Sequence, residues 1–411
     1  MFKDRGSIRR AVAILVAAVL GPAVAGAQPG PGAPDPHTVH IRLGPLWVKP
    51  TLAITNLGVD TNLFNESDAN HPQSDVNLTL VPAVNMWLPF RSSWINGSVK
   101  EDLVSYKKFA SEQSASTSST LGWTIPLARI TMVTTGSWLK TKERPGFEID
   151  ARAVRSELTY GGAVELRALS KTHVGVRAER REVAFDEGQT FLGSDLHDEL
   201  NRTKTVEAVT LRHELTPLTS LTLDGSRIQD RFEFSRLRDA DSTQITAGVA
   251  FTPDALVSGF AKMGYLNFSP LEAALPEFRG ATAAANLSYV ARDSTRLKLQ
   301  VTRDVQFSFD INQPYYLLTG ATASVSQQIY GPIDVDARLT RERLSYRERA
   351  GQSVEVPNRV DRARSVGVGI GYRVGENVRV AFNIDQQTRE SAVESRSYSG
   401  LRYGIAVTYG L

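Results

Sequence analysis

The last stretch of the sequence, "LRYGIAVTYGL" from Leu401 to Leu411, repeats with a period of two residues. Large apolar side chains occupy every second position, at Leu401, Tyr403, Ile405, Val407, Tyr409 and Leu411. This period is typical of a β-strand whose two faces meet different surroundings. The residues between the apolar ones are mostly glycine, alanine and threonine. We expect a final strand with one apolar face and one small, polar face, and no tail after it.

The overall composition excludes several classes of protein. Charged residues make up 22% and hydrophobic residues 41% of the 411 residues, and the mean hydropathy is -0.21. The chain is therefore not a disordered polyelectrolyte, yet it is slightly poor in apolar residues for a large packed core. No cysteine is present, which excludes disulfides, a thiol nucleophile and a cysteine-based zinc site.

Residues 1–27 have the three parts of a secretory signal peptide. A basic segment, residues 3–10, precedes the apolar run Ala11–Leu20, and Ala25-Gly26-Ala27 forms a small-x-small cleavage signal. The apolar run is too short to span a bilayer as a helix. Cleavage removes four of the 47 basic and one of the 44 acidic residues. The mature chain is then neutral, which gives no support for a nucleic-acid partner.

The rest of the chain alternates short turns with long polar loops. Residues 28–43 are rich in proline and glycine and predict a short periplasmic linker. Turn-forming residues then recur near Pro89, Pro126, Leu169, Thr216, Thr252, Arg292, Tyr330 and Val374. Polar segments lie between them, at Asn65–Ser74, Phe109–Ser116, Lys142–Asp150, Phe185–Arg202, Ser235–Ser242, Ser269–Phe278, Asp310–Pro314, Arg347–Arg362 and Arg389–Ser395.

This alternation predicts an antiparallel barrel. Eight short turns and nine long loops connect 18 strands, each about 12 to 16 residues long. A β-propeller would need four short strands in each repeat, whereas these repeats hold two. Short periplasmic turns, long extracellular loops and an even strand number are typical of outer-membrane barrels. The prediction is an all-β fold in which residues 44–411 form a transmembrane, up-and-down β-barrel, with no helical period after residue 27.

The alternating faces of the strands predict which side chains line the interior. Apolar residues would face lipid, because only a closed barrel or a helix satisfies every backbone group there. The charged residues on the other faces carry both signs, so strong ion selectivity is not expected. The predicted lumen-lining residues are Arg177, Glu179, Arg181, Asp224, Lys298, Asp304, Asp334, Asp336, Arg338, Arg373, Arg379, Asp385 and Arg402.

Two segments resemble bacterial outer-membrane β-barrel proteins. The alternating residues Tyr403, Ile405, Val407, Tyr409 and Leu411 resemble the C-terminal assembly signal of that superfamily, although Leu replaces its commonest final residue, Phe. The hairpin "GVDTNLFNESDANHPQSD", residues 58–75, is similar to the start of β-barrel porins, some of which accompany exopolysaccharide export systems. The resemblance implies the outer membrane of a Gram-negative bacterium and the barrel-assembly machinery as a partner. It also implies periplasmic polysaccharide-export proteins as candidate partners.

One histidine is a candidate for catalysis. His197 lies in "SDLHDE" beside Asp195, Asp198 and Glu199, and an aspartate-oriented histidine acts as a base on water in some rim enzymes. The same composition is common in ordinary solvated loops. We therefore predict no catalytic residue, no cofactor and no metal, and keep a protease-like rim enzyme as an alternative.

A segment rich in arginine has two interpretations. Residues 338–365 carry eight arginines with fewer acids between them: Arg338, Arg341, Arg343, Arg347, Arg349, Arg359, Arg362 and Arg364. These residues could attract anions at the mouth or hold lipopolysaccharide phosphates from outside. They could equally be solvated loop charges.

Four functions remain open at this point. The leading hypothesis is a water-filled, porin-like channel for polar solutes. The alternatives are the outer-membrane conduit of an exopolysaccharide export system, the rim enzyme at His197, and a structural or adhesive barrel.

Overall fold

A computed structural model of the chain describes residues 41–410, except 92, 254, 293 and 376. The predicted signal peptide, residues 28–40 of the predicted linker, and Leu411 lie outside these described residues. The short strand β1 (Ile41–Leu43) pairs with β2, with Ile41 opposite Val48. Among the described residues, no helix is long and apolar enough to cross a membrane.

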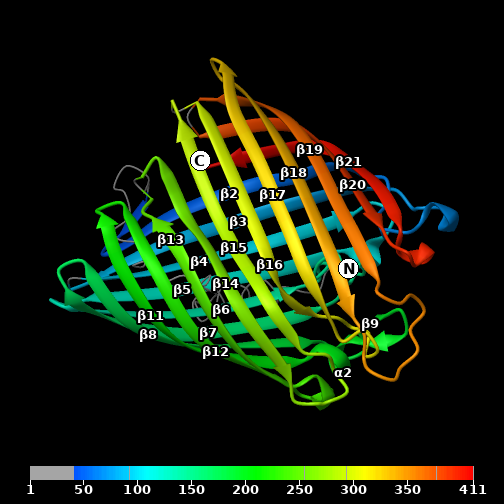
Figure 1. Ribbon diagram of the computed structural model, residues 1–411. Coiled ribbons are helices and arrows are strands. Elements are labelled where there is room, and N and C mark those ends of the chain that lie inside the picture. The colour runs from blue at the N-terminus through cyan, green and yellow to red at the C-terminus, as the bar shows by residue number, and fades with distance from the viewer. Residues whose placement is uncertain (1–40, 92, 254, 293, 376, 411) are drawn as a thin grey trace, which may run out of the picture.

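Eighteen long antiparallel strands form one closed barrel (Figure 1). Each strand has 12 to 16 residues, as the sequence predicts. The strands are β2 (Leu46–Asp60), β3 (Asp75–Phe90), β4 (Ser93–Tyr106), β5 (Ser114–Pro126), β6 (Ile130–Thr141), β7 (Arg155–Leu169), β8 (Thr172–Phe185), β11 (Arg202–Thr216), β12 (Thr219–Phe232), β13 (Ala240–Phe251), β14 (Val257–Pro270), β15 (Phe278–Ala291), β16 (Thr295–Phe307), β17 (Tyr315–Tyr330), β18 (Ile333–Arg347), β19 (Val360–Val374), β20 (Val378–Glu390) and β21 (Tyr398–Tyr409).

The predicted alternation of short turns and long loops is confirmed. All eight short turns fall where expected, for example between β7 and β8 and between β17 and β18. The longest connection, between β8 and β11, carries the small strands β9 (Thr190–Phe191) and β10 (Ser194–Asp195) and the helix α2 (Leu196–Leu200). Single 3-10 turns lie in four other loops, at η1 (Asp68–Asn70), η2 (Ala110–Glu112), η3 (Arg236–Arg238) and η4 (Glu394–Arg396).

A short helix, α2, follows residue 27 although the sequence shows no helical period there. Its five residues are too few to show a helical period in the sequence. The side chain of Asp195 caps its first turn by accepting a hydrogen bond from the backbone N of His197, 2.9 Å away. Leu196 and Leu200 are buried under the loop, so packing stabilises this helix more than helix propensity does.

The barrel closes where the last strand meets the first long strand. β21 pairs with β2 from Leu52 opposite Tyr409 to Asp60 opposite Arg402, with an irregularity between Ile54 and Leu57. The backbones approach closely here, because a Cβ added at Gly58 would lie 2.1 Å from the carbonyl O of Tyr403. A Cβ added at Gly404 would lie 2.8 Å from the Cα of Gly58. Glycine in the final stretch therefore permits closure of the barrel.

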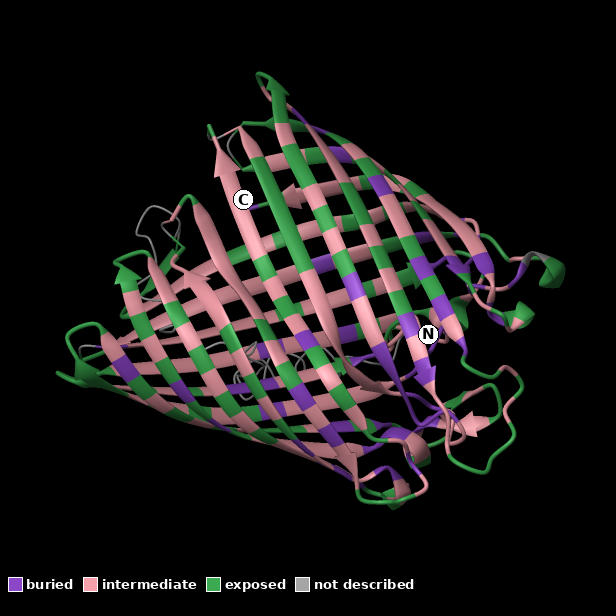
Figure 2. Ribbon diagram, in the orientation of Figure 1, coloured by how far each residue is buried: buried purple, intermediate pink, exposed green. Residues whose placement is uncertain are grey.

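The two faces of each strand differ as predicted. On β21, Tyr403, Ile405 and Tyr409 are 39%, 43% and 55% exposed. The same alternation runs along β19, where Val368 and Ile370 are more than half exposed. Figure 2 shows exposed residues alternating with less exposed ones along the front strands. In a membrane, the exposed apolar face is the one that contacts lipid.

One pair of strands separates near the loop end of the barrel. β15 and β16 pair only from Ala283 opposite Arg303 to Ala291 opposite Thr295, although both strands continue beyond Ala283 and Arg303. The free carbonyl of Ala281 accepts a hydrogen bond from Nε of Arg303 at 3.0 Å. Beyond this point, side chains of β16 and β17 pack on residues of β13 and β14 in one buried cluster, formed by Ala240, Leu266, Phe268 and Tyr315 with Phe278, Val305 and Phe307 around it.

The face assignment of the last strand predicts the effect of two neighbouring substitutions. Ile405→Arg places a charge on the lipid-facing side, which costs ~2 to 4 kcal/mol near the bilayer midplane. Ala406→Arg points to the opposite face and should be tolerated far better. The measurement is the yield of folded, heat-modifiable barrel from outer membranes. Equal losses for both variants would contradict the assignment.

Candidate channel constriction

A row of glycines on β19 lets charged side chains from its two neighbours meet across it. A Cβ added at Gly371 would lie 2.5 Å from the guanidinium of Arg379 on β20, and one at Gly367 would lie 2.1 Å from Oδ1 of Asp385. Gly369 is covered in the same way by carboxamide and carboxylate oxygens of β20 and β18. The absence of side chains on this face of β19 therefore makes room for ion pairs between β18 and β20.

These ion pairs join the two strands at several levels. Arg379 donates to Oδ1 of Asp334 at 2.5 Å and to Oδ1 of Asp336 at 3.2 Å. Arg338 on β18 donates to Oδ1 of Asp385 on β20 at 2.5 Å. Charged pairs hydrogen-bonded in this way are stronger than neutral ones. All five of these charged side chains therefore have a counter-charge within reach.

A loop between β6 and β7 crosses the barrel from the opposite side. We call residues 142–154 the inner loop. In strand order, β6 and β7 lie halfway around the barrel from β18, yet Glu148 of the inner loop accepts a hydrogen bond from the hydroxyl of Tyr346 on β18. Glu148 also accepts one from Ser308 Oγ at 2.7 Å. The loop therefore spans the interior, and the strand face that carries Tyr346 looks inward.

Buried arginines pin the inner loop to the barrel wall. Arg389 on β20 donates to the backbone O of Phe147 and to a carboxylate oxygen of Asp150. Both of these bonds come from Nη1 of Arg389, and its Nη2 donates to Oδ2 of Asp361 at 2.5 Å. Arg396, in the next loop, donates to the backbone O of Glu148. Arg389 and Arg396 are 2% and 3% exposed, so these contacts are largely screened from water.

Apolar side chains of the inner loop pack on both sides of it. Ile149 is 4% exposed and belongs to a cluster with Phe185, Leu196, Leu200 and Phe309. Phe147 packs against a second cluster, on the wall, made of Tyr316, Leu344 and Tyr346. The inner loop is therefore held by both charge and hydrophobic contact, and it narrows the barrel near its loop end.

Among the described residues, two cavities follow the wall that the inner loop contacts, and a smaller one of about 150 Å³ lies between the inner loop and the side of β7 and β8. The first has a volume of about 530 Å³ and lies between the inner loop and the wall of β16–β18, β20 and β21. The second has a volume of about 310 Å³ and lies over the ion pairs of β18 and β20. Arg402 lines both cavities, so they follow one another along the same wall.

The charges around the two cavities are balanced. The first is lined by three cationic and three anionic side chains, Arg144, Arg152, Arg402, Glu143, Asp150 and Glu342. The second is lined by two of each sign, Arg338, Arg402, Asp336 and Asp385. Burial and the charges of Arg152 and Arg402 lower the pKa of Arg144 to about 10, which still leaves it cationic at neutral pH.

The structure places all thirteen predicted lumen-lining residues on the strand face opposite the exposed apolar side chains. Several make further ion pairs there, such as Arg402 with Asp60 at 2.8 Å and Lys262 with Asp224 at 3.3 Å. Asp336, Arg338, Asp385 and Arg402 line the second cavity. That the thirteen residues border the route of a solute stays a prediction.

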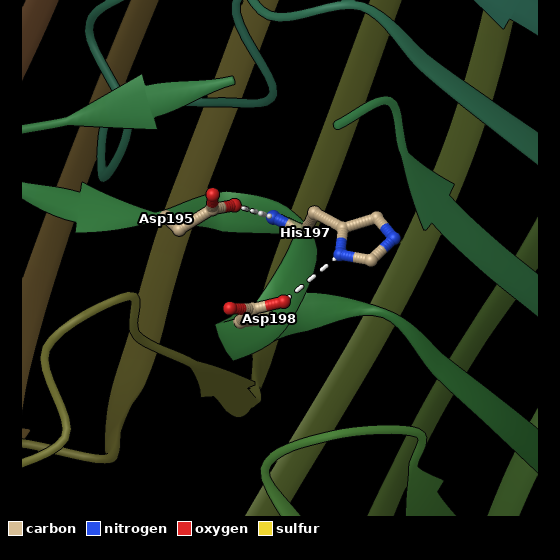
Figure 3. Close-up of side chains that lie close together, drawn as sticks. All are labelled: Asp195, His197 and Asp198. Atoms are coloured by element: carbon tan, nitrogen blue, oxygen red, sulfur yellow. Dashed lines mark hydrogen bonds and ion pairs between the residues drawn. The ribbon is translucent and has the colours of Figure 1, made fainter. Parts of the chain in front are cut away.

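His197 lies in α2, within the loop between β8 and β11 (Figure 3), and it lines neither cavity. Its Nδ1 is 3.0 Å from Oδ1 of Asp198, and Asp195, His197 and Asp198 are close enough to hold one cation. Asp195 already caps α2, and the imidazole packs on Phe234 with ring centroids 4.6 Å apart. The hydrogen bond with Asp198 raises the pKa of His197, which favours the protonated form that binds no metal. These contacts fit a role in packing the loop.

The inner loop is the functional element that the sequence analysis missed. The charges of its segment "KERPGFEID" predict an ordinary extracellular loop. Two large apolar residues within it, Phe147 and Ile149, are unusual for a solvated loop and could have indicated that it is buried.

A closed antiparallel barrel with an apolar outer face, paired interior charges and a loop across its interior defines an outer-membrane channel. The chain belongs to the family "Putative beta-barrel porin 2", whose sequence profile matches residues 34–410. It is thus a porin-like channel for polar solutes, located in the outer membrane, as the sequence predicted. A comparison with curated proteins finds no match.

Solved porin structures resemble the chain at low sequence identity. The outer membrane protein opdK from Pseudomonas aeruginosa is 10% identical, with 88% of this chain and 98% of that chain covered and a TM-score of 0.45. OccAB4 from Acinetobacter baumannii is 8% identical, with 91% and 99% covered and a TM-score of 0.46. Pseudomonas aeruginosa OccK2 (OpdF), crystallised with glucuronate, is 10% identical, with 88% and 97% covered and a TM-score of 0.45.

The arginine contacts of the inner loop predict the effect of releasing it. Arg389→Ala removes the buried guanidinium that joins Asp150 of the inner loop to Asp361 of β19, so Asp361 keeps only Arg359 and Asp150 keeps only Arg396, 3.7 Å away. Breaking a buried pair costs about 3 to 5 kcal/mol when no partner remains, so we expect a smaller cost here. The inner loop should then leave the wall, so single-channel conductance in planar bilayers should become larger and noisier.

Arg379→Ala is the matched control for this experiment. Arg379 is on the same strand and face as Arg389, but its partners Asp334 and Asp336 are on β18, away from the inner loop. This variant should conduct as steadily as the wild type because the inner loop stays in place, and only its ion selectivity should shift. Traces of Arg389→Ala that match the wild type would show that the loop does not depend on these contacts.

Proposed function

We propose that solutes cross this barrel by diffusion through the two cavities beside the inner loop, and that the channel has only weak ion selectivity. The observation that carries the proposal is the balance of charge around both cavities, three cations against three anions and then two against two. A wall of paired opposite charges repels neither sign strongly. It also offers hydrogen-bond donors and acceptors to uncharged solutes.

Transport by the proposed route requires no chemical reaction of the solute. Several of the interior charges along the route are held in ion pairs, as in Arg338 with Asp385 and Arg402 with Asp60. Charges in a dry interior would cost several kcal/mol each even when paired, and a water-filled path removes most of that cost. The protein then works by giving polar solutes a way around the hydrocarbon, without enzymatic activity.

Cysteine labelling tests the route directly, because the chain has no cysteine of its own. Gln387→Cys lines the first cavity and Asn383→Cys lines the second. A small cationic thiol reagent should lower the conductance of each variant in bilayers, since it narrows the path and adds charge. Ile370→Cys, on the exposed outer face and in neither cavity, is the matched control and should show no change.

Two outcomes would contradict the proposal in different ways. Conductance that is insensitive to the reagent at Gln387→Cys would place the route on the other side of the inner loop. A barrel that inserts but never conducts would favour the export conduit, in which partner proteins move the inner loop.

A further inference from the structure

We infer that the outer face of β18 and β19 carries a binding site for the phosphate groups of lipopolysaccharide. Four arginines form this site, two on each strand, and we call them the outer arginines: Arg341, Arg343, Arg362 and Arg364. The structure separates them from the other arginines of the same segment, because Arg338 points inward to Asp385 and Arg359 is buried against Asp361.

The outer arginines stand directly opposite one another. Arg341 pairs in register with Arg364, and Arg343 pairs with Arg362. Like charges at directly opposed positions of a sheet are destabilising. All four residues are exposed, so water screens part of this repulsion. The arrangement still concentrates four positive charges on about two residues' length of two strands.

No described residue neutralises this cluster. The ion pairs and side-chain hydrogen bonds of the described residues include none with the outer arginines. Glu390 on β20, opposite Arg362, is the one acidic residue in register with them. On β17, the residues opposite Arg343 and Arg341 are the uncharged Thr319 and Ala321. Opposite Thr319, on β16, is a further arginine, Arg303.

Outward arginines on β8 and β12 have their own counter-charges. On β12, Arg227 and Arg231 lie 3.7 Å and 2.5 Å from the carboxylate of Asp241. On β8, Arg180 lies 3.0 Å from Glu182. These three arginines are therefore paired within the chain, whereas the outer arginines are not.

The position of the cluster matches the level of lipid phosphates. Below it on β19, apolar side chains occupy every second position from Val374 to Val366, about 26 Å of strand at ~3.3 Å per residue. With the tilt of a barrel strand, this length covers most of the ~25 Å apolar band. Arg364 and Arg362 follow at the edge of this band, on the side of the long β18–β19 loop. Headgroup phosphates of the outer leaflet lie at that level.

Guanidinium groups suit this ligand. Arginine binds phosphate oxygens through two parallel N–H donors, with more directional contact than lysine gives. The Cβ atoms of directly opposed residues lie about 4.5 to 5.5 Å apart. Guanidinium groups from both strands can therefore reach one phosphate. The neighbouring apolar residues Leu339, Val366 and Val368 offer a surface for the acyl chains of the same molecule.

The test measures lipid binding to the purified full chain in detergent. Diphosphorylated lipid A, the same lipid without phosphates, and inorganic phosphate are added separately, and the thermal midpoint and the bound lipid mass are followed. Only the diphosphorylated lipid should raise the midpoint of the wild type. Arg341→Gln with Arg364→Gln should weaken its binding at least roughly tenfold, the expected cost of losing charge-assisted hydrogen bonds.

Two further variants keep the test decisive. Arg227→Gln with Arg231→Gln removes two outward arginines that already pair with Asp241, and it should leave lipid binding unchanged. Arg341→Lys with Arg364→Lys keeps the charge but loses the bidentate hydrogen bonds of the guanidinium groups. The affinity of this variant for the diphosphorylated lipid should lie between those of the wild type and the glutamine variant. Equal lipid binding by the wild type and the glutamine variant, or an equal shift with inorganic phosphate, would overturn the site.

Discussion

The hydrogen bonds between β2 and β21 are the interaction on which the rest of the structure depends. A sheet in lipid cannot leave an edge unpaired, because no water is present to satisfy its backbone groups. Closure brings Gly58 and Gly404 so near that a side chain on either would displace the other strand. Once the sheet is closed, every strand has one face toward lipid and one toward the interior. Both the channel and its outer surface follow from that division.

Inside, the division brings opposite charges together and separates them from lipid. The glycines of β19 carry no side chains, so Arg379 reaches Asp334 and Arg338 reaches Asp385 across this strand. Near the loop end, the same inward face supplies Arg389, whose contacts with the inner loop narrow the barrel. Outside, the arginines of β18 and β19 have no such partners, which is why they suit an anionic lipid.

Most of the fold could be predicted from the sequence because its signals are local. A period of two along each strand, with turn residues at eight points, is sufficient to give 18 strands and their faces, as in "VGVGIGYRV" at residues 366–374. The inner loop could not be predicted in this way. Its docking depends on Arg389 and Arg396, more than 230 residues further along the chain, and no local pattern reports such a contact. The separation of β15 from β16 is also a tertiary effect, of the cluster around Phe268 and Tyr315.

The central claim is that the interior offers a wide enough, charge-balanced path for polar solutes. The most direct measurement is the potential at zero current of the wild-type channel in a planar bilayer that separates two concentrations of potassium chloride. The account predicts a potential close to zero, because the charges around both cavities balance. A potential near the limiting value for either potassium or chloride alone would contradict it, since one sign of charge would then control the path.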